Sequence, residues 1–435
     1  MKNHAGDQEH SHSEHIHEHA HGHVHHHAEG HDHAHTDDRV GDHVRGHAHV
    51  HNHDSGAYSS RRDFLRVLMG GALAGASVLE LAYHRAAWAR AAAPEADENL
   101  FELQKAANGV YFAHAKPQTV INCNAAIFVR SKDVVVVDAH SKPSAAASII
   151  RQIRREITDK PVRYVINTHF HWDHTQGDYA YAMTGSKVDF IASSMTKKLM
   201  EEFAVQRMKA SRDAVPGQIE AMQHRAEKAA SDAEKAFCAE QIRQLQAYQA
   251  DIKEYHLELP SITFDKSYLL ADPAFDLHLD FHGRSHTAGD VFVFCPQQLA
   301  LATGDAIHGW LPNIADGYPR LWPGTVDEVA HADFKYLMGG HGPMQSNDRT
   351  VMMCQRNYIE ELTEKVEAGK KAGLTLAELQ ARMTVASLKS MQSNGYQAFL
   401  ERTLAASHPH FGKMPPLQND VNANIGDVYK NLDRV

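Results

Sequence analysis

Four residues that could bind a metal ion lie close together near the middle of the chain: His169, His171, Asp173 and His174. They follow a largely apolar run at 162–166, which predicts a buried strand that ends in this segment. His169 and His171 are two positions apart, so both imidazoles can point to the same side of an extended backbone. Imidazole nitrogen and carboxylate oxygen suit divalent metals such as zinc. The segment therefore predicts a metal site at the end of a strand.

Three more residues of these types lie just past predicted strands elsewhere in the chain. His286 lies in a glycine-bounded turn at 283–290. Asp305 follows a strand predicted at 299–302, and His341 follows one predicted at 336–338. A single loop histidine would mean little, but repeated placement of potential ligands at strand ends is hard to produce by chance. The neighbouring glycines allow the backbone to turn, so the side chains can reach inward.

The elements around these loops alternate between strands and helices from about residue 100 to 192. Apolar runs predict strands at 109–113, 125–129 and 134–137, and the last of these ends at Asp138. A helix is predicted at 144–157, with Ser144 as its N-cap. Strands that alternate with helices and carry ligands at their carboxyl ends are typical of α/β enzymes.

The segment 195–258 differs, because Ala, Glu, Lys, Gln and Met dominate it. It predicts a helical insertion, folded as a hairpin of two long helices with a break at Pro216 and Gly217. The hairpin could act as a lid, as a dimerisation arm that forms a homo-oligomer, or as a scaffold packed on the sheet. Strands resume after Pro260. Residues 349–435 predict a helical C-terminal extension that becomes loose after Pro409.

The overall composition is that of a soluble globular protein, with 43% hydrophobic and 23% charged residues. The formal net charge of −10 leaves no broad basic surface, so we expect no nucleic-acid partner. The cysteines form no C-x-x-C pair, and we predict buried free thiols at Cys123, Cys238, Cys295 and Cys354.

Histidine dominates the first part of the chain, since 19 of the 35 histidines lie before residue 54. Residues 1–58 have almost no apolar side chains beyond Ala and Val, so we predict a disordered leader. The repeated His-x-His spacing could chelate metal weakly at several positions. A metal-collecting tail and a variable solvated leader are both compatible with this composition.

Residues 59–91 resemble a twin-arginine signal peptide. Arg61 and Arg62 are followed by Phe64 and Leu65, then by a weakly apolar, Gly- and Ala-rich stretch, and 89–91 resembles a cleavage site. A membrane anchor is the alternative, but the apolar stretch is short and contains Glu80, so we expect no stable membrane insertion. This signal predicts export of the folded protein to the periplasm by the twin-arginine machinery.

Taken together, the motifs resemble those of metallo-β-lactamase-fold hydrolases over about residues 105–345. The shared features are His-x-His-x-Asp-His, Gly-x-x-His-Thr-x-Gly-Asp at His286, Thr-Gly-Asp at Asp305, Gly-His-Gly at His341 and a strand-end Asp138. The resemblance implies an α/β fold, with residues 100–345 forming an αββα sandwich and the site at one edge between two sheets. Two positions depart from the usual pattern: Gln176 replaces a frequent glycine, and Gly339 replaces a frequent proline.

The resemblance also assigns each potential ligand to one of two metal ions. The assignment is His169, His171 and His286 for the first ion, Asp173, His174 and His341 for the second, and Asp305 as the bridge. We expect two Zn²⁺ per chain, with Fe or Mn as alternatives. A water shared by two such metals becomes a hydroxide near neutral pH and can attack a carbonyl. Asp173, or the bridging site, would accept and donate protons in catalysis.

Asp305 distinguishes between branches of the family. True metallo-β-lactamases generally lack an aspartate there, whereas glyoxalase II-like thioesterases, lactonases and phosphodiesterases of the fold carry one. We therefore expect an exported dinuclear zinc hydrolase whose partner is a small-molecule ester, thioester, lactone or lactam. Two alternatives remain. One is a periplasmic metal-binding or metal-handling protein with the His-rich leader as its working part. The other is a β-lactamase-like enzyme that degrades antibiotics.

Aromatic residues near the ligands could line an apolar substrate pocket or could be ordinary packing. They are Phe170, Trp172, Trp310, Tyr318 and Trp322. His308 follows Asp305 by three positions and could reach substrate, but we predict that it lies in a surface loop.

Overall fold

The computed structural model describes residues 100–434, with the exception of 117–121 and 408–416. The described residues belong to one compact unit. The His-rich leader predicted at 1–58 and the export signal predicted at 59–91 lie outside the described residues. No helix in the described part of the chain has the length and hydropathy that crossing a membrane requires.

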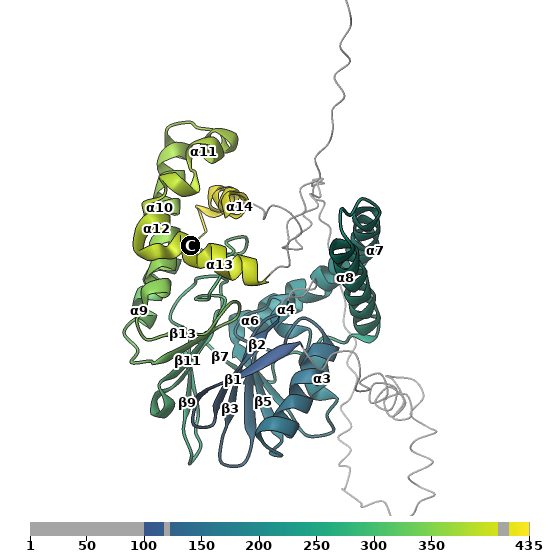
Figure 1. The fold of residues 1–435 in the computed structure, drawn as a ribbon. Coiled ribbons are helices and arrows are strands. Elements are labelled where there is room, and N and C mark those ends of the chain that lie inside the picture. Colours follow the sequence, from purple (N-terminus) through teal and green to yellow (C-terminus); the bar gives the residue numbers. More distant parts are fainter. Residues whose placement is uncertain (1–99, 117–121, 408–416, 435) are drawn as a thin grey trace, which may run out of the picture. The chain divides into compact units, whose positions relative to one another are not determined.

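Two β-sheets lie face to face at the centre of the fold (Figure 1). The first has the order β1-β2-β3-β4-β5-β6-β7, antiparallel as far as β4 and parallel from there to β7. Its strands are β1 (Phe101–Ala107), β2 (Val110–Ala115), β3 (Ala125–Val129), β4 (Val134–Val137), β5 (Val162–Ile166), β6 (Asp189–Ser193) and β7 (Ile262–Phe264).

The second sheet has the order β13-β12-β11-β10-β9-β8, in which β11 and β12 run parallel and the other neighbours antiparallel. Its strands are β8 (Ser267–Leu270), β9 (Leu277–Asp280), β10 (Phe292–Cys295), β11 (Ala300–Gly304), β12 (Tyr336–Gly339) and β13 (Gln345–Ser346). The carboxyl ends of β11 and β12 therefore meet at one edge of this sheet.

Both faces of the central strands are buried, which explains why their sequences are apolar without interruption. In β4, Val135 and Val137 enter the core between the two sheets, whereas Val134 and Val136 belong to the outer core. Successive side chains of a strand alternate between its faces, so this run of valines serves two cores. The helices α3 (Pro143–Gln152) and α5 (Asp178–Ala182) cover the outer face.

The C-terminal helices cover the outer face of the second sheet. Phe292 and Leu301 of the sheet share one apolar cluster with Ile359 and Ile425 of the helices. The helices are α9 (Trp322–Val329), α10 (Thr350–Lys371), α11 (Leu376–Arg382), α12 (Lys389–Gln392), α13 (Tyr396–Ser407) and α14 (Leu417–Asn431). This arrangement confirms the predicted αββα sandwich with a helical C-terminal extension.

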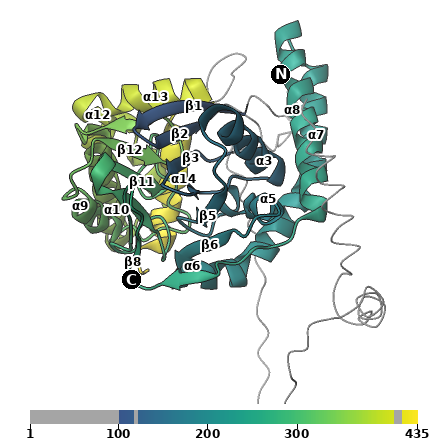
Figure 2. The same ribbon diagram turned by 90° about the horizontal axis from the view of Figure 1, so that it is seen from below.

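The helical insertion contains α6 (Ser194–Leu199) and two long helices, α7 (Val205–Glu227) and α8 (Asp232–Asp251). The long helices lie side by side (Figure 2). Val215 of α7 and Tyr248 of α8 share an apolar cluster with Tyr179 of α5. The insertion therefore packs on the element that follows the motif loop at 169–174.

The predicted break at Pro216 is wrong, because α7 continues through this exposed residue. Proline removes one helix hydrogen bond, but at an exposed position the freed carbonyl can turn to water. The chain reverses at 228–231 instead. There the Ser231 side chain caps α8 by accepting a hydrogen bond from the Glu234 N–H.

Two further local predictions are also wrong. Ser144 is not an N-cap, because α3 already begins at Pro143, whose fixed φ suits the first helical position. The segment after Pro409 is not loose from Leu417 onward, since Val421, Ile425 and Val428 fall on the buried face of α14. The four cysteines are buried free thiols, as predicted.

Candidate metal centre

The structure brings the seven predicted ligands together, and none of them is more than 7% exposed. They come from the carboxyl ends of strands in both sheets and from one connecting loop. His169 and His171 follow β5, Asp173 and His174 lie in the short helix α4 (Trp172–Thr175), His286 lies between β9 and β10, Asp305 follows β11, and His341 follows β12. The site therefore lies at one edge of the sandwich, between the ends of strands from the two sheets.

Asp138, at the end of β4, shapes the start of the motif loop. The backbone N–H of Thr168 donates to its Oδ1 over 2.8 Å, and the Thr168 hydroxyl donates to its Oδ2 over 2.9 Å. Its Oδ2 also accepts a hydrogen bond of 2.9 Å from His174 Nδ1. One strand-end carboxylate therefore fixes both the backbone before His169 and the ring of His174.

Asp290 has a similar role in the loop that carries His286. Its carboxylate accepts hydrogen bonds of 2.6 Å from the Ser285 hydroxyl, 2.8 Å from the Thr287 N–H and 2.6 Å from the Thr287 hydroxyl. The two residues that flank His286 are thus held by one side chain. This fixes the backbone from which the histidine projects.

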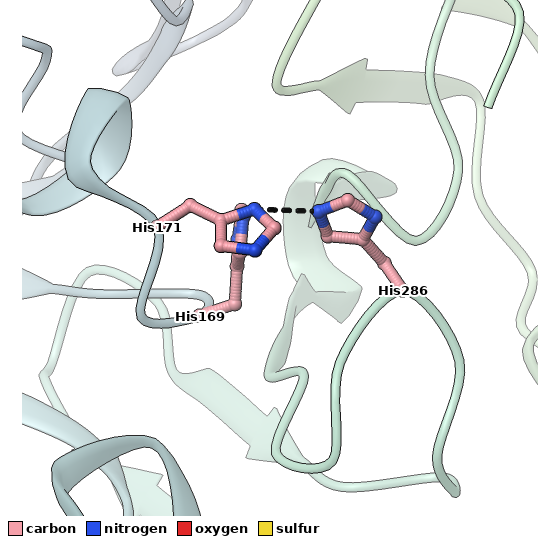
Figure 3. A group of neighbouring side chains, drawn as sticks. All are labelled: His169, His171 and His286. Carbon is pink, nitrogen blue, oxygen red and sulfur yellow. Dashed lines mark hydrogen bonds between the residues drawn. The ribbon is translucent and has the colours of Figure 1, made fainter. Parts of the chain in front are cut away.

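His169, His171 and His286 form the three-histidine cluster, in which the rings from two loops point toward one another (Figure 3). His171 Nδ1 and His286 Nε2 are 2.9 Å apart. The other nitrogen of each ring has an acceptor: His171 Nε2 donates to Asp316 over 2.8 Å, and His286 Nδ1 donates to the Asn313 carbonyl over 3.0 Å. Because those outer nitrogens carry the protons, the inner nitrogens of the neutral rings present lone pairs.

Asp173, His174 and His341 form the aspartate cluster. Oδ2 of Asp173 lies 3.1 Å from His341 Nε2 and 3.5 Å from His174 Nε2. His174 again has its outer nitrogen bonded, to Asp138, so its Nε2 faces the cluster. The His341 ring is held by stacking on Trp310, with ring centroids 4.6 Å apart and planes 11° from parallel.

Asp305 lies between the two clusters. Its Oδ2 is 3.3 Å from His341 Nε2 and 3.7 Å from His286 Nε2, and its Oδ1 is 3.4 Å from His174 Nε2. The carboxylate can therefore reach both ligand sets at once. The approach depends on Gly340, because a Cβ at that position would collide with the Asp305 carboxylate and the His174 ring.

These residues fit a pair of divalent metal ions. His169 Nε2, His174 Nε2 and Asp305 Oδ1 are buried and have no hydrogen-bond partner in the protein. Unpaired polar atoms are costly in a protein interior. The contact of 2.9 Å between His171 Nδ1 and His286 Nε2, dashed in Figure 3, has no proton to share while both ring protons lie on the outer nitrogens. A cation bound to the inner atoms would satisfy all of them, and the set of imidazoles and carboxylates is one that zinc accepts.

Electrostatics distinguish the two clusters in the metal-free protein. Burial and the neighbouring His174 hold the pKa of His169 well below its usual range, and burial lowers the pKa of His171 to about 4. Burial would also lower the pKa of His341, but the carboxylates of Asp305 and Asp173 outweigh it and raise the value to about 9. The aspartate cluster therefore holds a proton at neutral pH.

The structure corrects the prediction for His308 and decides between the two readings of some aromatic residues. His308 is 2% exposed, because the Trp310 N–H donates to its ring and its own N–H donates to Gln355 of α10. Trp322 is fully buried and donates to the Ala306 carbonyl over 2.8 Å. Phe170 is buried as well, so both of these aromatic residues are ordinary packing.

Sequence reasoning missed the groups that hold the outer nitrogens of the three-histidine cluster. Asp316 and the Asn313 carbonyl lie in an irregular loop, and Arg207 of α7 forms a fork with Asp316 over 2.7 and 3.0 Å. An acidic loop residue is too common to be a signal, and a backbone carbonyl has no sequence signature.

Comparison with known proteins places this geometry among related folds. Residues 119–341, slightly more than half of the chain, match the model of the Metallo-beta-lactamase superfamily. The stereoselective inverting sec-alkylsulfatase Pisa1 from Pseudomonas sp. is 17% identical, with a TM-score of 0.53 over 77% of this chain and 50% of that one. The chain thus spans half the length of the alkylsulfatase, and the likeness shows a shared fold.

Two smaller enzymes are also similar. A metallo-beta-lactamase from Pontibacter korlensis is 18% identical, with a TM-score of 0.44 over 60% of this chain and 99% of that one. The metallo-beta-lactamase FIM-1 from Pseudomonas aeruginosa, in its mono-zinc form, is 17% identical, with a TM-score of 0.43 over 61% of this chain and 98% of that one.

We predict that the two clusters bind metal with different pH dependence. A histidine whose pKa is about 9 is protonated at pH 7, so a metal entering the aspartate cluster must displace that proton. Affinity there should rise by up to about tenfold per pH unit between pH 7 and 9 for each proton displaced. His169 and His171 are already neutral, so affinity at the three-histidine cluster should change little.

Calorimetric titration of metal-free protein with Zn²⁺ in buffers of different ionisation enthalpy measures the protons released in each binding step. Two steps with the same pH dependence and the same proton release would contradict this prediction.

Proposed function

Because the chain belongs to the metallo-β-lactamase superfamily, we propose that it is a dinuclear zinc hydrolase for small carbonyl substrates. The substrate classes are esters, thioesters, lactones and lactams. The position of Asp305 between the three-histidine cluster and the aspartate cluster carries this proposal, because one carboxylate within reach of both ligand sets could serve two cations at once. Such a ligand set is similar to that of glyoxalase II-like members of the superfamily.

The residues of the chain have separate roles in this proposal. A pair of bound divalent cations supplies an activated water and a Lewis acid for the carbonyl group. The hydrogen bonds on the outer nitrogens of His171, His174 and His286 hold the rings in the tautomer that binds metal. Asp173 is the most exposed of the seven predicted ligands, so its carboxylate lies at the edge of the site, where it would relay a proton between the reacting groups and solvent.

The printed names of the similar structures extend the set of substrates to be tried. Sulfate esters join the panel because the match with the alkylsulfatase covers 77% of this chain and so reaches beyond residues 119–341. β-Lactams represent the lactam class that is already in the panel. Carbonyl substrates remain our proposal, and turnover of sulfate esters alone would replace it.

We predict that Asp305→Ala lowers the metal content from two ions toward one per chain and removes hydrolase activity. Loss of an outer contact to a ligand already costs about 10–100-fold in metal affinity or activity, so loss of a bridging ligand should cost at least about 100-fold. Metal analysis after dialysis and a substrate panel measure both effects. Asp327→Ala is the matched control, because Asp327 of α9 pairs with Arg356 of α10 among the helices that cover the outer face of the second sheet.

Two outcomes would overturn the proposed function. One is wild-type protein that retains no metal. The other is metal-replete protein that hydrolyses no member of the panel, which would favour a metal-binding or metal-handling role instead.

We also propose that the protein is exported folded to the periplasm. Support comes from the twin-arginine pattern at Arg61 and Arg62 and from the small residues at 89–91. The prediction is a mature N-terminus near Ala92, and Arg61→Lys with Arg62→Lys should leave an unprocessed precursor in the cytoplasm. Mass measurement of the periplasmic protein tests this. A mature chain that keeps residues 1–58 would contradict it and give the His-rich leader a role after export.

A further inference from the structure

The loop at 312–316 touches two of the three ligands in the three-histidine cluster. The Asn313 carbonyl accepts from His286 Nδ1 over 3.0 Å, and Asp316 Oδ2 accepts from His171 Nε2 over 2.8 Å. The loop thus orients one histidine from each of the two loops that meet in Figure 3. Its position decides how the two inner nitrogens face each other.

The C-terminal helix α14 holds this loop from behind. Asn424 donates to the Pro312 carbonyl over 2.9 Å, and Asn431 donates to the carbonyls of Ile314 and Ala315, each over 2.9 Å. The two asparagines are seven positions apart, so they lie on the same face of the helix. Both are buried, at 4% and 1% exposed. Two buried side-chain amides thus donate to backbone carbonyls of one irregular loop and hold it in a fixed position against α14.

The inserted helix α7 holds the other end of the loop. Both terminal nitrogens of Arg207 donate to the Asp316 carboxylate, over 2.7 and 3.0 Å. The guanidinium also lies over the Phe170 ring, 4.7 Å from its centroid, beside the motif loop. A forked arginine contact fixes the plane of a carboxylate and therefore its direction toward His171.

The aspartate cluster is supported by other parts of the chain. His174 donates to Asp138 in the first sheet. The backbone on either side of His341 is held by Asn124, which donates to the carbonyls of Gly339 and Gly342 over 2.9 Å each. Neither support involves the loop at 312–316. The two clusters therefore have separate outer contacts.

We propose that α14 and α7 together position the ligands of the three-histidine cluster through the loop at 312–316, and so set the metal affinity of that cluster alone. This rests on the proposed two-metal function. Asn431, Arg207 and Asp316 are positioning residues, because they act on the metal through His171 and His286. The C-terminal extension and the insertion thereby become part of the metal centre without supplying a ligand.

The test measures stepwise Zn²⁺ affinity by competition with a chromophoric chelator, in Arg207→Met and in Asn431→Ala. Each substitution should weaken one of the two binding steps by about tenfold, at the lower end of the 10–100-fold effect of outer contacts, and leave the other step unchanged. Arg207 is 29% exposed, so its replacement should preserve the fold even if Asn431→Ala lowers stability.

Arg356→Met is the matched control. Arg356 of α10 also forks onto an aspartate, Asp327 of α9, over 3.0 and 2.9 Å. Its other hydrogen bonds go to Asn357 and Glu360 of its own helix. Its loss should lower the melting temperature of metal-free protein about as much as Arg207→Met does, but it should leave both affinities unchanged. If Arg356→Met weakens Zn²⁺ binding as much as Arg207→Met does at a similar loss of stability, the proposal is overturned.

Two ligand-deficient backgrounds identify which cluster is affected. In His341→Ala protein the three-histidine cluster remains, so Arg207→Met should still weaken the remaining ion about tenfold. In His286→Ala protein the aspartate cluster remains, and Arg207→Met should have no effect. Equal effects in both backgrounds would overturn the proposal, and so would no effect in either, while the proposed function would stand. Wild-type protein that binds fewer than two ions would overturn both.

Discussion

Hydrogen bonds on the outer nitrogens of the histidines fix the direction in which each ring faces the candidate metal centre. His169, His171, His174 and His286 each have one nitrogen paired with an oxygen of the protein, which commits the other nitrogen to the centre. The buried rings of His169, His171 and His286 present lone pairs to one small volume, and these would repel each other unless a cation joined them. The folded chain therefore presents a group of buried donor atoms that a cation would satisfy, and loops at the ends of strands in both sheets contribute to this group.

The outer contacts also connect two helices outside the sheets, α7 and α14, with the orientation of the histidines. The core between the sheets brings the strand ends together, but strand ends alone do not orient an imidazole. Asp138 performs this task within the first sheet, whereas His171 and His286 depend on an irregular loop. That loop has few backbone hydrogen bonds of its own, so the buried asparagines of α14 and the arginine of α7 define its position.

Much of this could be predicted from the sequence, and the reasons are local. Both faces of β4 are buried, so residues 134–137 are all valine and the sequence predicts a strand there. The His-x-His-x-Asp-His motif follows β5, as the apolar run at 162–166 suggested. The prediction at Pro216 is wrong because a helix can continue through a proline whose surroundings are exposed to water. Exposure depends on the tertiary structure, which the local sequence does not show. The contact of Arg207 with Asp316 joins positions 109 residues apart, and the contact from His286 ends on a carbonyl. Neither has a pattern that a single sequence could reveal.

The most direct test of this account is anomalous diffraction at the zinc edge from crystals of zinc-loaded protein. We expect two peaks, one among His169, His171 and His286 and one among Asp173, His174 and His341, with the Asp305 carboxylate between them. A single peak in a fully loaded crystal, or two peaks that Asp305 does not join, would contradict the account.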